Sequence, residues 1–207
     1  MGWPHNYVQA YTWATKPLAS AYTGRAFISD IGGGSIWVSN GTRWYPENGS
    51  VVLYNKATPT SGTYATIGIA AQYLMPGGIM QDGDTLEFMM TCSKTGTTTT
   101  ATHDMRFGSA GLVTDPTLNS GSGGTPGALT LTQNPYSRVK RIGVTTLKYM
   151  GSFWTTMGSS TSAMATDTTV SSLDSPIYIT RTTTALANVG DTFTLHEFTI
   201  RLIAAGI

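Results

Sequence analysis

The sequence predicts an all-β protein: an antiparallel β-sandwich of jelly-roll type, preceded by a small β-hairpin module and an N-terminal arm. Three observations lead to this prediction. Threonine is abundant over the 207 residues, and its β-branched side chain favours strands. Short runs of alternating apolar and polar residues recur, with a turn signal about every ten residues. No long window places helix-forming residues at helical spacing.

The predicted N-terminal arm covers residues 1–23, the hairpin module 24–55 and the sandwich domain 56–207. The arm is rich in aromatic residues that follow little periodicity, so it either packs on its own domain or docks on a neighbouring subunit. We predict that the arm and the module together supply an interface with another chain. The candidate interface residues are Trp3, Tyr7, Tyr11, Trp13, Trp37 and Trp44.

The hairpin module is predicted from its turn signals. A run of three glycines separates its first two strands, and glycine permits any backbone turn. Asn40-Gly41 separates the second strand from the third, and Asn-Gly is the strongest short hairpin signal. Trp37 and Trp44 on these strands form either the small core of the module or a surface that stacks on sugars. The predicted strands are 25–30, 35–39 and 42–46.

The sandwich domain is predicted from longer strands whose apolar residues alternate with polar ones. In two strands the alternation changes parity, which predicts bulges near Arg141 and at His196-Glu197. Segments 108–127 and 155–175 are rich in small polar residues, and we predict that they are surface loops facing outward. The predicted strands of this domain are 64–73, 85–93, 97–107, 138–150, 177–181 and 191–203, and a further predicted strand, 50–54, falls at the end of the hairpin module.

The charge content is the most informative feature of the composition. Only 11% of the chain is charged, against roughly 25% in an ordinary soluble domain. The 12 basic and 11 acidic residues give a net charge of +1, so we expect no nucleic acid or anionic lipid partner. Either the exterior is rich in hydroxyl groups, or much of the surface is buried against copies of the chain and its neighbours. We expect the second, because a net charge near zero promotes association.

Cysteine usage and hydropathy exclude further classes of protein. The single cysteine, Cys92, excludes a disulfide framework, and its position on an apolar strand face predicts a buried, inert thiol. The apolar runs are far shorter than the ~20 residues that span a bilayer, so no membrane insertion is expected. Residues 1–6 have neither the basic segment nor the apolar core of a signal peptide.

The histidines do not form a catalytic pair with their neighbours in the sequence. His103-Asp104 and His196-Glu197 are adjacent residues on predicted strands, so their side chains point to opposite faces. A bulge at the second pair is the one way in which either side chain could be re-aimed. We therefore expect ordinary strand histidines.

The carboxylates are also scattered singly along the chain. Asp82 and Asp84 flank one glycine, which fits a turn better than a calcium loop, because the remaining ligands of such a loop are missing. We predict no catalytic residue, no cofactor and no metal site. The expected protein is not an enzyme.

Two parts of the chain resemble proteins of tailed bacteriophages. Residues 24–49 run GRAFISDIGGGSIWVSNGTRWYPENG, and they resemble a small hairpin module that recurs in tail fibres and other virion appendages. Residues 75–87 (MPGGIMQDGDTLE), 93–97 (SKTGT) and 105–108 (MRFG) resemble the β-sandwich domain that often follows this module. The resemblance covers most of residues 24–204.

The resemblance implies a virion structural protein, usually a homotrimer, with no catalytic activity. The sequence contains no shaft of repeats or coiled coil, so we expect a short tail fibre or appendage that contacts a host surface glycan or protein. The expected location is the virion, assembled in the host cytoplasm beside other tail or capsid proteins. A capsid decoration, cement or head fibre protein is the alternative, and a carbohydrate-active depolymerase is a third hypothesis from another class.

Overall fold

The computed structural model describes residues 8–63, 66–95, 101–123, 131–133, 136–153, 167–183 and 191–206. These residues form strands and one short 3-10 helix, η1 (Ala19–Ala21). None of the described segments is a helix long and apolar enough to cross a membrane. The strands are β1 (Gln9–Tyr11), β2 (Thr23–Ile28), β3 (Ser35–Asn40), β4 (Trp44–Pro46), β5 (Ser50–Lys56), β6 (Thr60–Gly62), β7 (Gly68–Met75), β8 (Thr85–Thr95), β9 (Ala101–Gly108), β10 (Thr117–Gly123), β11 (Leu131–Gln133), β12 (Tyr136–Gly143), β13 (Thr146–Phe153), β14 (Asp167–Thr169), β15 (Ile177–Thr183) and β16 (Thr192–Ile203).

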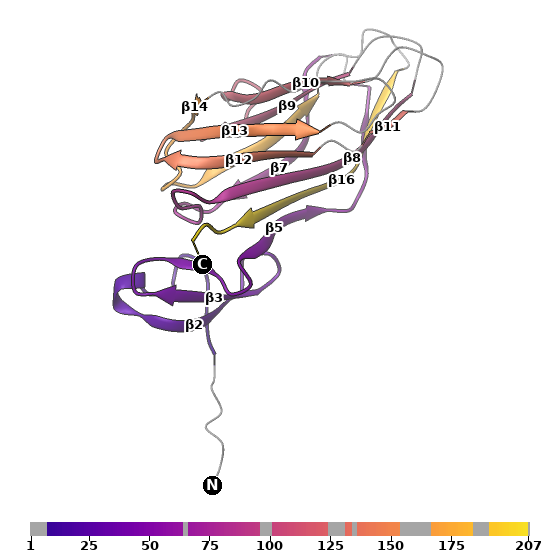
Figure 1. Cartoon of the computed structure of the whole chain (residues 1–207). Helices are drawn as coiled ribbons and strands as arrows, with labels where there is room; N and C mark the ends of the chain where they lie inside the picture. Colours follow the sequence, from indigo (N-terminus) through magenta and orange to yellow (C-terminus); the bar gives the residue numbers. More distant parts are fainter. Residues whose placement is uncertain are drawn as a thin grey trace.

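Two sheets pack face to face and form a sandwich (Figure 1). The long sheet has the order β14-β13-β12-β8-β16-β5, with β11 paired to β8 and β6 paired to β16, and the short sheet has the order β10-β9-β15-β7. Eight of the sandwich strands form its central pattern, and in chain order they are β5, β7, β8, β9, β10, β12, β15 and β16. The first, eighth, third and sixth of them are neighbours in the long sheet, and the second, seventh, fourth and fifth in the short sheet. This is the strand order of a jelly roll, and the predicted fold class is confirmed.

The small sheet consists of β1, β2, β3 and β4 in that order and lies beside β5 of the sandwich (Figure 1). Its strand β1 comes from the segment predicted to be an arm, and it pairs with β2 in parallel. The strands β2, β3 and β4 are the three predicted for the hairpin module. The strand β5 was assigned to that module from the sequence, but its hydrogen-bonding partner is β16 of the long sheet.

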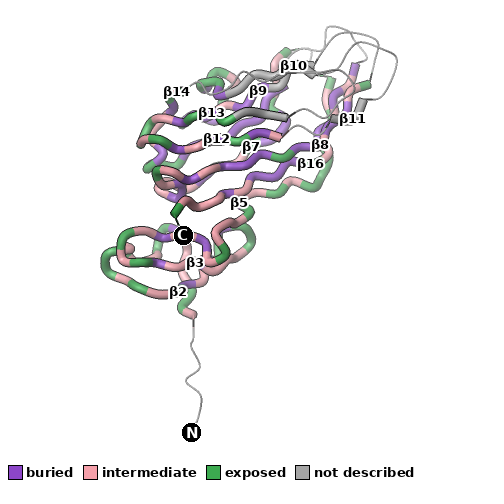
Figure 2. Tube along the Cα trace, viewed as in Figure 1, coloured by how far each residue is buried: buried purple, intermediate pink, exposed green. Residues whose placement is uncertain are grey.

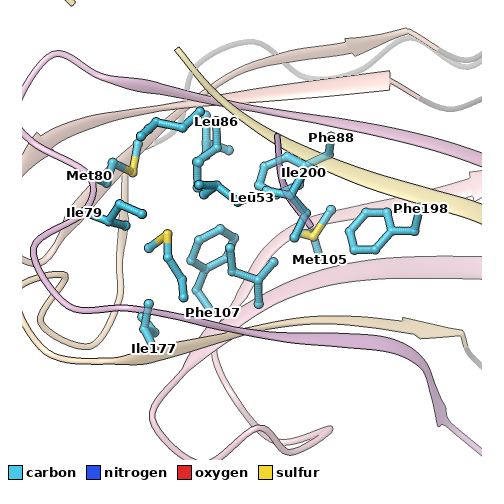
Figure 3. Packing of buried hydrophobic residues seen from close by; sticks show 14 of the residues in the cluster. Leu53, Ile79, Met80, Leu86, Phe88, Met105, Phe107, Ile177, Phe198 and Ile200 are labelled. Carbon is cyan, nitrogen blue, oxygen red and sulfur yellow. The ribbon is translucent and has the colours of Figure 1, made fainter. Parts of the chain in front are cut away.

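The core of the sandwich is filled by side chains from both sheets (Figure 3). Phe88 of the long sheet meets Phe107 of the short sheet edge to face, with 6.0 Å between ring centroids, and stacks on Phe198 at 6.4 Å. Full burial of such a ring stabilises the fold by about 1.5–3 kcal/mol. Buried and exposed segments alternate along the sandwich strands, as the two-residue period of a strand requires (Figure 2).

The irregular points of the strands agree only in part with the predicted bulges. The register between β16 and β8 shifts between Leu195 and Glu197, which confirms the bulge predicted there. The predicted strand 138–150 is instead two strands, β12 and β13, joined by a turn after Gly143. The register between them is irregular from Arg141 to Gly143. The change in apolar alternation seen in the sequence near Arg141 therefore coincides with this irregularity and with the end of β12.

The two predicted loops also require correction. The segment 108–127 is not a loop throughout, because β10 within it pairs with β9 in the short sheet. Apart from the buried Leu118, the sequence of β10 consists of Gly and small polar residues, and sheet pairing overrides its weak strand propensity. Of the second predicted loop, 155–175, residues 155–166 lie outside the described residues, and β14 pairs with β13.

Candidate functional site

Three of the predicted interface residues lie inside this chain's own fold. Trp37 is fully buried, and Trp13 and Trp44 expose only 8% and 5% of their surface. The structure therefore corrects the expectation that these rings stand on a surface open to another chain. They fill the core of the small sheet because that sheet has few other large apolar side chains to bury.

The remaining interface candidates belong to the segment predicted as an arm. Tyr11 on β1 is half-buried, and its ring meets that of Tyr22 edge-on with 6.5 Å between centroids. The described part of the arm therefore lies on its own chain, as one of the two alternatives expected. Trp3 and Tyr7 lie outside the described residues, and for them the interface stays a prediction.

The faces of the buried tryptophans are already covered by other side chains. Trp13 meets Trp37 edge-on with 4.9 Å between centroids, and Lys16 Nζ lies 3.9 Å from the centroid of the Trp13 ring. Tyr22 stacks on Trp44 at 5.3 Å. A small core is thus the better interpretation of Trp37 and Trp44, and neither ring offers an open face on which a sugar could stack.

The small sheet is attached to the sandwich through a buried ion pair. Arg43 Nη2, from the hairpin segment, donates to Asp84 Oδ1 at 2.8 Å. Asp84 is fully buried and also accepts hydrogen bonds from the backbone N–H groups of Gln81 and Ala205, each at 2.8 Å. Both carboxylate oxygens therefore accept hydrogen bonds from groups of the chain. We call this contact, Arg43 with Asp84, Gln81 and Ala205, the joint.

A second contact strengthens the attachment beside the joint. Trp13 Nε1 donates to the carbonyl oxygen of Gly77 at 2.9 Å. A side chain at Gly77 would place its Cβ 2.4 Å from the carbonyl oxygen of Asp174, so only glycine lets the backbone at residue 77 lie this close to the backbone at Asp174. Buried Arg141 holds the neighbouring turns together, with Nε 2.7 Å from Asp82 Oδ1 and Nη1 3.0 Å from Asp174 Oδ1.

The two carboxylates considered as calcium ligands serve two different arginines. Asp82 pairs with Arg141 and Asp84 pairs with Arg43, which fits the turn interpretation of this segment. Within the described part of the chain, no group of three or more His, Cys, Asp or Glu side chains is placed to hold a metal ion. The acidic side chains at this turn therefore have a structural use.

The described histidine and cysteine side chains show no activated nucleophile. His196 Nε2 lies 2.7 Å from Ser93 Oγ, but no described acidic side chain hydrogen-bonds to this imidazole to orient it. Cys92 is buried as predicted, and burial raises the pKa of its thiol to about 12, which keeps it protonated and unreactive. His5 and the side chain of His103 lie outside the described residues.

A charged cluster that the sequence did not reveal stands on the outer face of the long sheet. Glu87 of β8 points outward, opposite Arg138 of β12 and Arg201 of β16, and is nevertheless fully buried. Arg138 Nε donates to Glu87 Oε1 at 2.8 Å, and Arg201 Nε donates to Oε2 at 2.7 Å. The Nη2 atoms of both arginines and the hydroxyl of Tyr136 donate to the same carboxylate. We call these four residues the Glu87 cluster.

The Glu87 carboxylate is held in its charged form. Burial raises the pKa of Glu87, but the hydrogen bonds from Tyr136, Arg201 and Arg138 together lower it by more than burial raises it. The pKa of Glu87 therefore lies below its ordinary value. Burial and the hydrogen bond to Glu87 raise the pKa of Tyr136, so its hydroxyl remains a donor. The cluster therefore contains two positive charges and one negative charge.

An open hollow of about 470 Å³ lies over this cluster. The side chains of Arg138 and Arg201 are 49% and 39% exposed, so both guanidinium groups remain accessible to a ligand above the buried carboxylate. The hollow is lined by Asn48, Gly49, Ser50, Glu87, Arg138, Arg201, Ile203, Ala204 and Gly206.

The outer face of the short sheet is partly covered by its own chain, although Gln72 and Leu74 of its edge strand β7 remain exposed. The loop between β9 and β10 lies over it, held by hydrogen bonds from Gln72 Nε2 to the carbonyl of Gly111 at 2.7 Å and from Arg106 Nη1 to the carbonyl of Asp115 at 2.9 Å. Thr180 on the covered face is fully buried. The outer face of the long sheet is the better candidate for binding a partner because it carries the open hollow with two accessible arginines.

Comparisons with known proteins add no function to this geometry. No family model and no curated protein matches the chain. A lectin I from Ulex europaeus, solved with the methyl glycoside of α-L-fucose, is similar with a TM-score of 0.35 and 8% identity, over 75% of this chain and 98% of the lectin. The CBM2 module of an evolved Dit protein from Lactobacillus casei BL23 phage J-1 is similar with a TM-score of 0.35 and 9% identity, over 98% of this chain and 90% of that one. Likeness at this level is too weak to transfer a ligand.

Proposed function

We propose that this chain is a non-enzymatic structural protein of a bacteriophage virion, a short trimeric tail fibre or appendage that contacts the host surface. The observation that carries the proposal is the joint. Arg43 lies in the hairpin segment and Asp84 in the sandwich segment, and each segment separately resembles a phage module. Their buried ion pair makes the two segments one structural unit, which fits modules that occur together.

The jelly roll and the composition are compatible with this proposal, although a fold alone never selects a function. A surface with few charges favours stable association with copies of the chain and with neighbouring virion proteins. The proposal assigns no catalytic role to any residue. The open face of the long sheet is the part of the sandwich that we assign to the host surface.

Two measurements test the proposal. Quantitative mass spectrometry and immunogold labelling of purified phage particles should find the chain at one place on the tail, in a copy number divisible by three. Sedimentation velocity of the purified chain should give a species of three times 22.0 kDa. Absence of the chain from particles would overturn the proposal, and a monomer at every concentration would overturn its trimeric part.

A capsid decoration, cement or head fibre protein is the second candidate, and the low charge content also favours it, because such a protein covers junctions between capsid subunits. Labelling distributed over the whole head, at one copy or trimer per junction, would select this candidate over the tail appendage. A depolymerase remains the third hypothesis. Incubation of purified chain with bacterial capsule should leave the polymer length unchanged if the non-enzymatic proposal is correct.

A further inference from the structure

We propose that the hollow over the Glu87 cluster binds phosphate groups of a polymer on the host surface, an inference that rests on the proposed function. The site consists of Arg138 and Arg201, positioned by the buried carboxylate of Glu87. Its chemistry follows from donors that the fold itself leaves unused.

The two arginines use only part of their hydrogen-bond donors within the fold. Each guanidinium uses Nε and Nη2 toward Glu87, and no described residue accepts a hydrogen bond from Nη1 of Arg138 or of Arg201. A guanidinium carries five N–H donors in a rigid plane, so the edge formed by Nη1 and Nη2 remains directed away from Glu87. Such an edge matches two oxygens of an oxyanion.

The charge of the cluster also favours an anion. Two guanidinium groups share one carboxylate, which leaves one positive charge uncompensated at the hollow. Lys140 and Lys148, paired across β12 and β13, stand on the same outer face, and Asp167 lies opposite Lys148 in the register. Because Asp167 and Glu197 also lie on this outer face, the excess of positive charge is concentrated at the two guanidinium groups.

The shape of the cluster favours phosphate over carboxylate. The arginines approach Glu87 from the two neighbouring strands, so their free edges lie on opposite sides of the buried carboxylate. Each edge pairs with two oxygens of one anion, and a tetrahedral phosphate keeps further oxygens for the polar groups of Asn48 and Ser50 in the lining, whereas a carboxylate has none left. Phosphates repeated along a polymer can occupy the two edges separately. Four cations on one face are few for a nucleic acid, whose binding depends on many phosphate contacts. We therefore assign the site to phosphate groups of a surface polymer.

The arginines have a matched control elsewhere in the chain. Arg25 is an exposed arginine in the small sheet, paired with Glu47, and it is not among the residues that line the hollow. Arg25→Gln, Arg138→Gln and Arg201→Gln therefore make the same change of charge, and only the last two alter the site. Arg138→Lys and Arg201→Lys keep the charge and remove the planar edge.

The binding experiment uses the full chain with sodium polyphosphate, polygalacturonate and neutral dextran as probes at one ionic strength, measured by calorimetry. We expect polyphosphate to bind most tightly and inorganic phosphate to compete. Arg138→Gln or Arg201→Gln should weaken binding about tenfold or more, the size expected for a charge-assisted contact. The lysine variants should also weaken it, whereas Arg25→Gln should leave it unchanged.

Several results would overturn the inference. The inference fails if Arg25→Gln and Arg201→Gln bind polyphosphate equally, or if the chain prefers polygalacturonate or dextran. It also fails if the lysine variants bind polyphosphate as tightly as the unaltered chain, or if chloride displaces polyphosphate as effectively as phosphate does. Because an arginine variant could misfold, circular dichroism is recorded for each, and phosphate competition is measured on the unaltered chain. A chain that is found in particles but does not bind polyphosphate overturns only this inference. A chain that binds polyphosphate but is absent from particles overturns the proposed function.

Discussion

The joint and the Glu87 cluster are built from the same chemical groups, around carboxylates only three residues apart, yet they differ in how far their arginines remain exposed. Asp84 in the joint and Glu87 in the cluster are both fully buried carboxylates paired with arginine. The Arg43 side chain is 19% exposed, whereas those of Arg138 and Arg201 are 49% and 39% exposed. Closed ion pairs hold parts of the fold together, and half-open ones present donors to a ligand.

The largest effect is expected from Asp84→Ala. This change removes the carboxylate of the joint and leaves a mostly buried arginine and two backbone N–H groups without their acceptor. We expect the free energy of unfolding to fall by about 3 kcal/mol or more, measured by urea denaturation. Asp82→Ala is the control, because its side chain is 64% exposed and its arginine keeps a second carboxylate.

Glu87→Ala should cost less, about 1–2 kcal/mol, because the two freed guanidinium groups can turn into water. The same urea denaturation measures this change. A decrease in unfolding free energy equal to that of Asp84→Ala would contradict the comparison, because the arginines of the Glu87 cluster would then be no better solvated than Arg43 of the joint.

Trp13→Phe tests the second contact that attaches the small sheet to the sandwich, beside the joint. Phenylalanine keeps most of the buried ring but removes the Nε1–H that donates to Gly77. We expect a loss of about 1 kcal/mol in unfolding free energy, together with faster proteolysis within residues 8–46 than within the sandwich. Unchanged proteolysis would show that this hydrogen bond does not hold the small sheet in place.

The pH dependence of stability should report the Glu87 cluster. The pKa of Glu87 is lowered in the folded state, so its contribution is fully present above the ordinary glutamate value of about 4.3. The contribution is lost as the pH falls through the lower, folded value. Urea denaturation at a series of acidic pH values should show a shallower loss for Glu87→Gln than for the unaltered chain, and parallel losses would refute this.

The smallest effect is expected from Arg25→Ala. Arg25 and Glu47 form an exposed pair, with 58% and 31% of their side chains accessible. Such pairs contribute roughly 0–1 kcal/mol, so thermal denaturation should change little. If Arg25→Ala lost as much stability as Glu87→Ala, the exposure of the arginine would not distinguish the contributions of the joint, the Glu87 cluster and the exposed Arg25–Glu47 pair.

The sequence was sufficient for features that local pattern determines. The bulge at His196-Glu197 was predictable because side chains on both sides of it keep strict alternation and change parity between them. The strands of the small sheet were predictable from Asn40-Gly41 and the glycine run. The split between β12 and β13 was missed because Gly143-Val144-Thr145 is not a common hairpin signal.

The candidate site was not predictable from local pattern. Glu87 meets Arg138 and Arg201 across separations of 51 and 114 residues, and only the register of neighbouring strands brings them together. The alternation placed Glu87 on the outer face, where an exposed glutamate is ordinary. The jelly-roll strand order, once assigned, would have been the usable signal, because it sets β8 between β12 and β16.

The position of β16 affects how the chain can fold during synthesis. This strand is the last of the described strands in chain order, yet it lies within the long sheet and pairs with β5, β6 and β8. Until it leaves the ribosome, β5 and β8 each present an unpaired edge, and such edges attract strands of other nascent chains. Slow translation or high expression should therefore increase aggregation before the sheet closes.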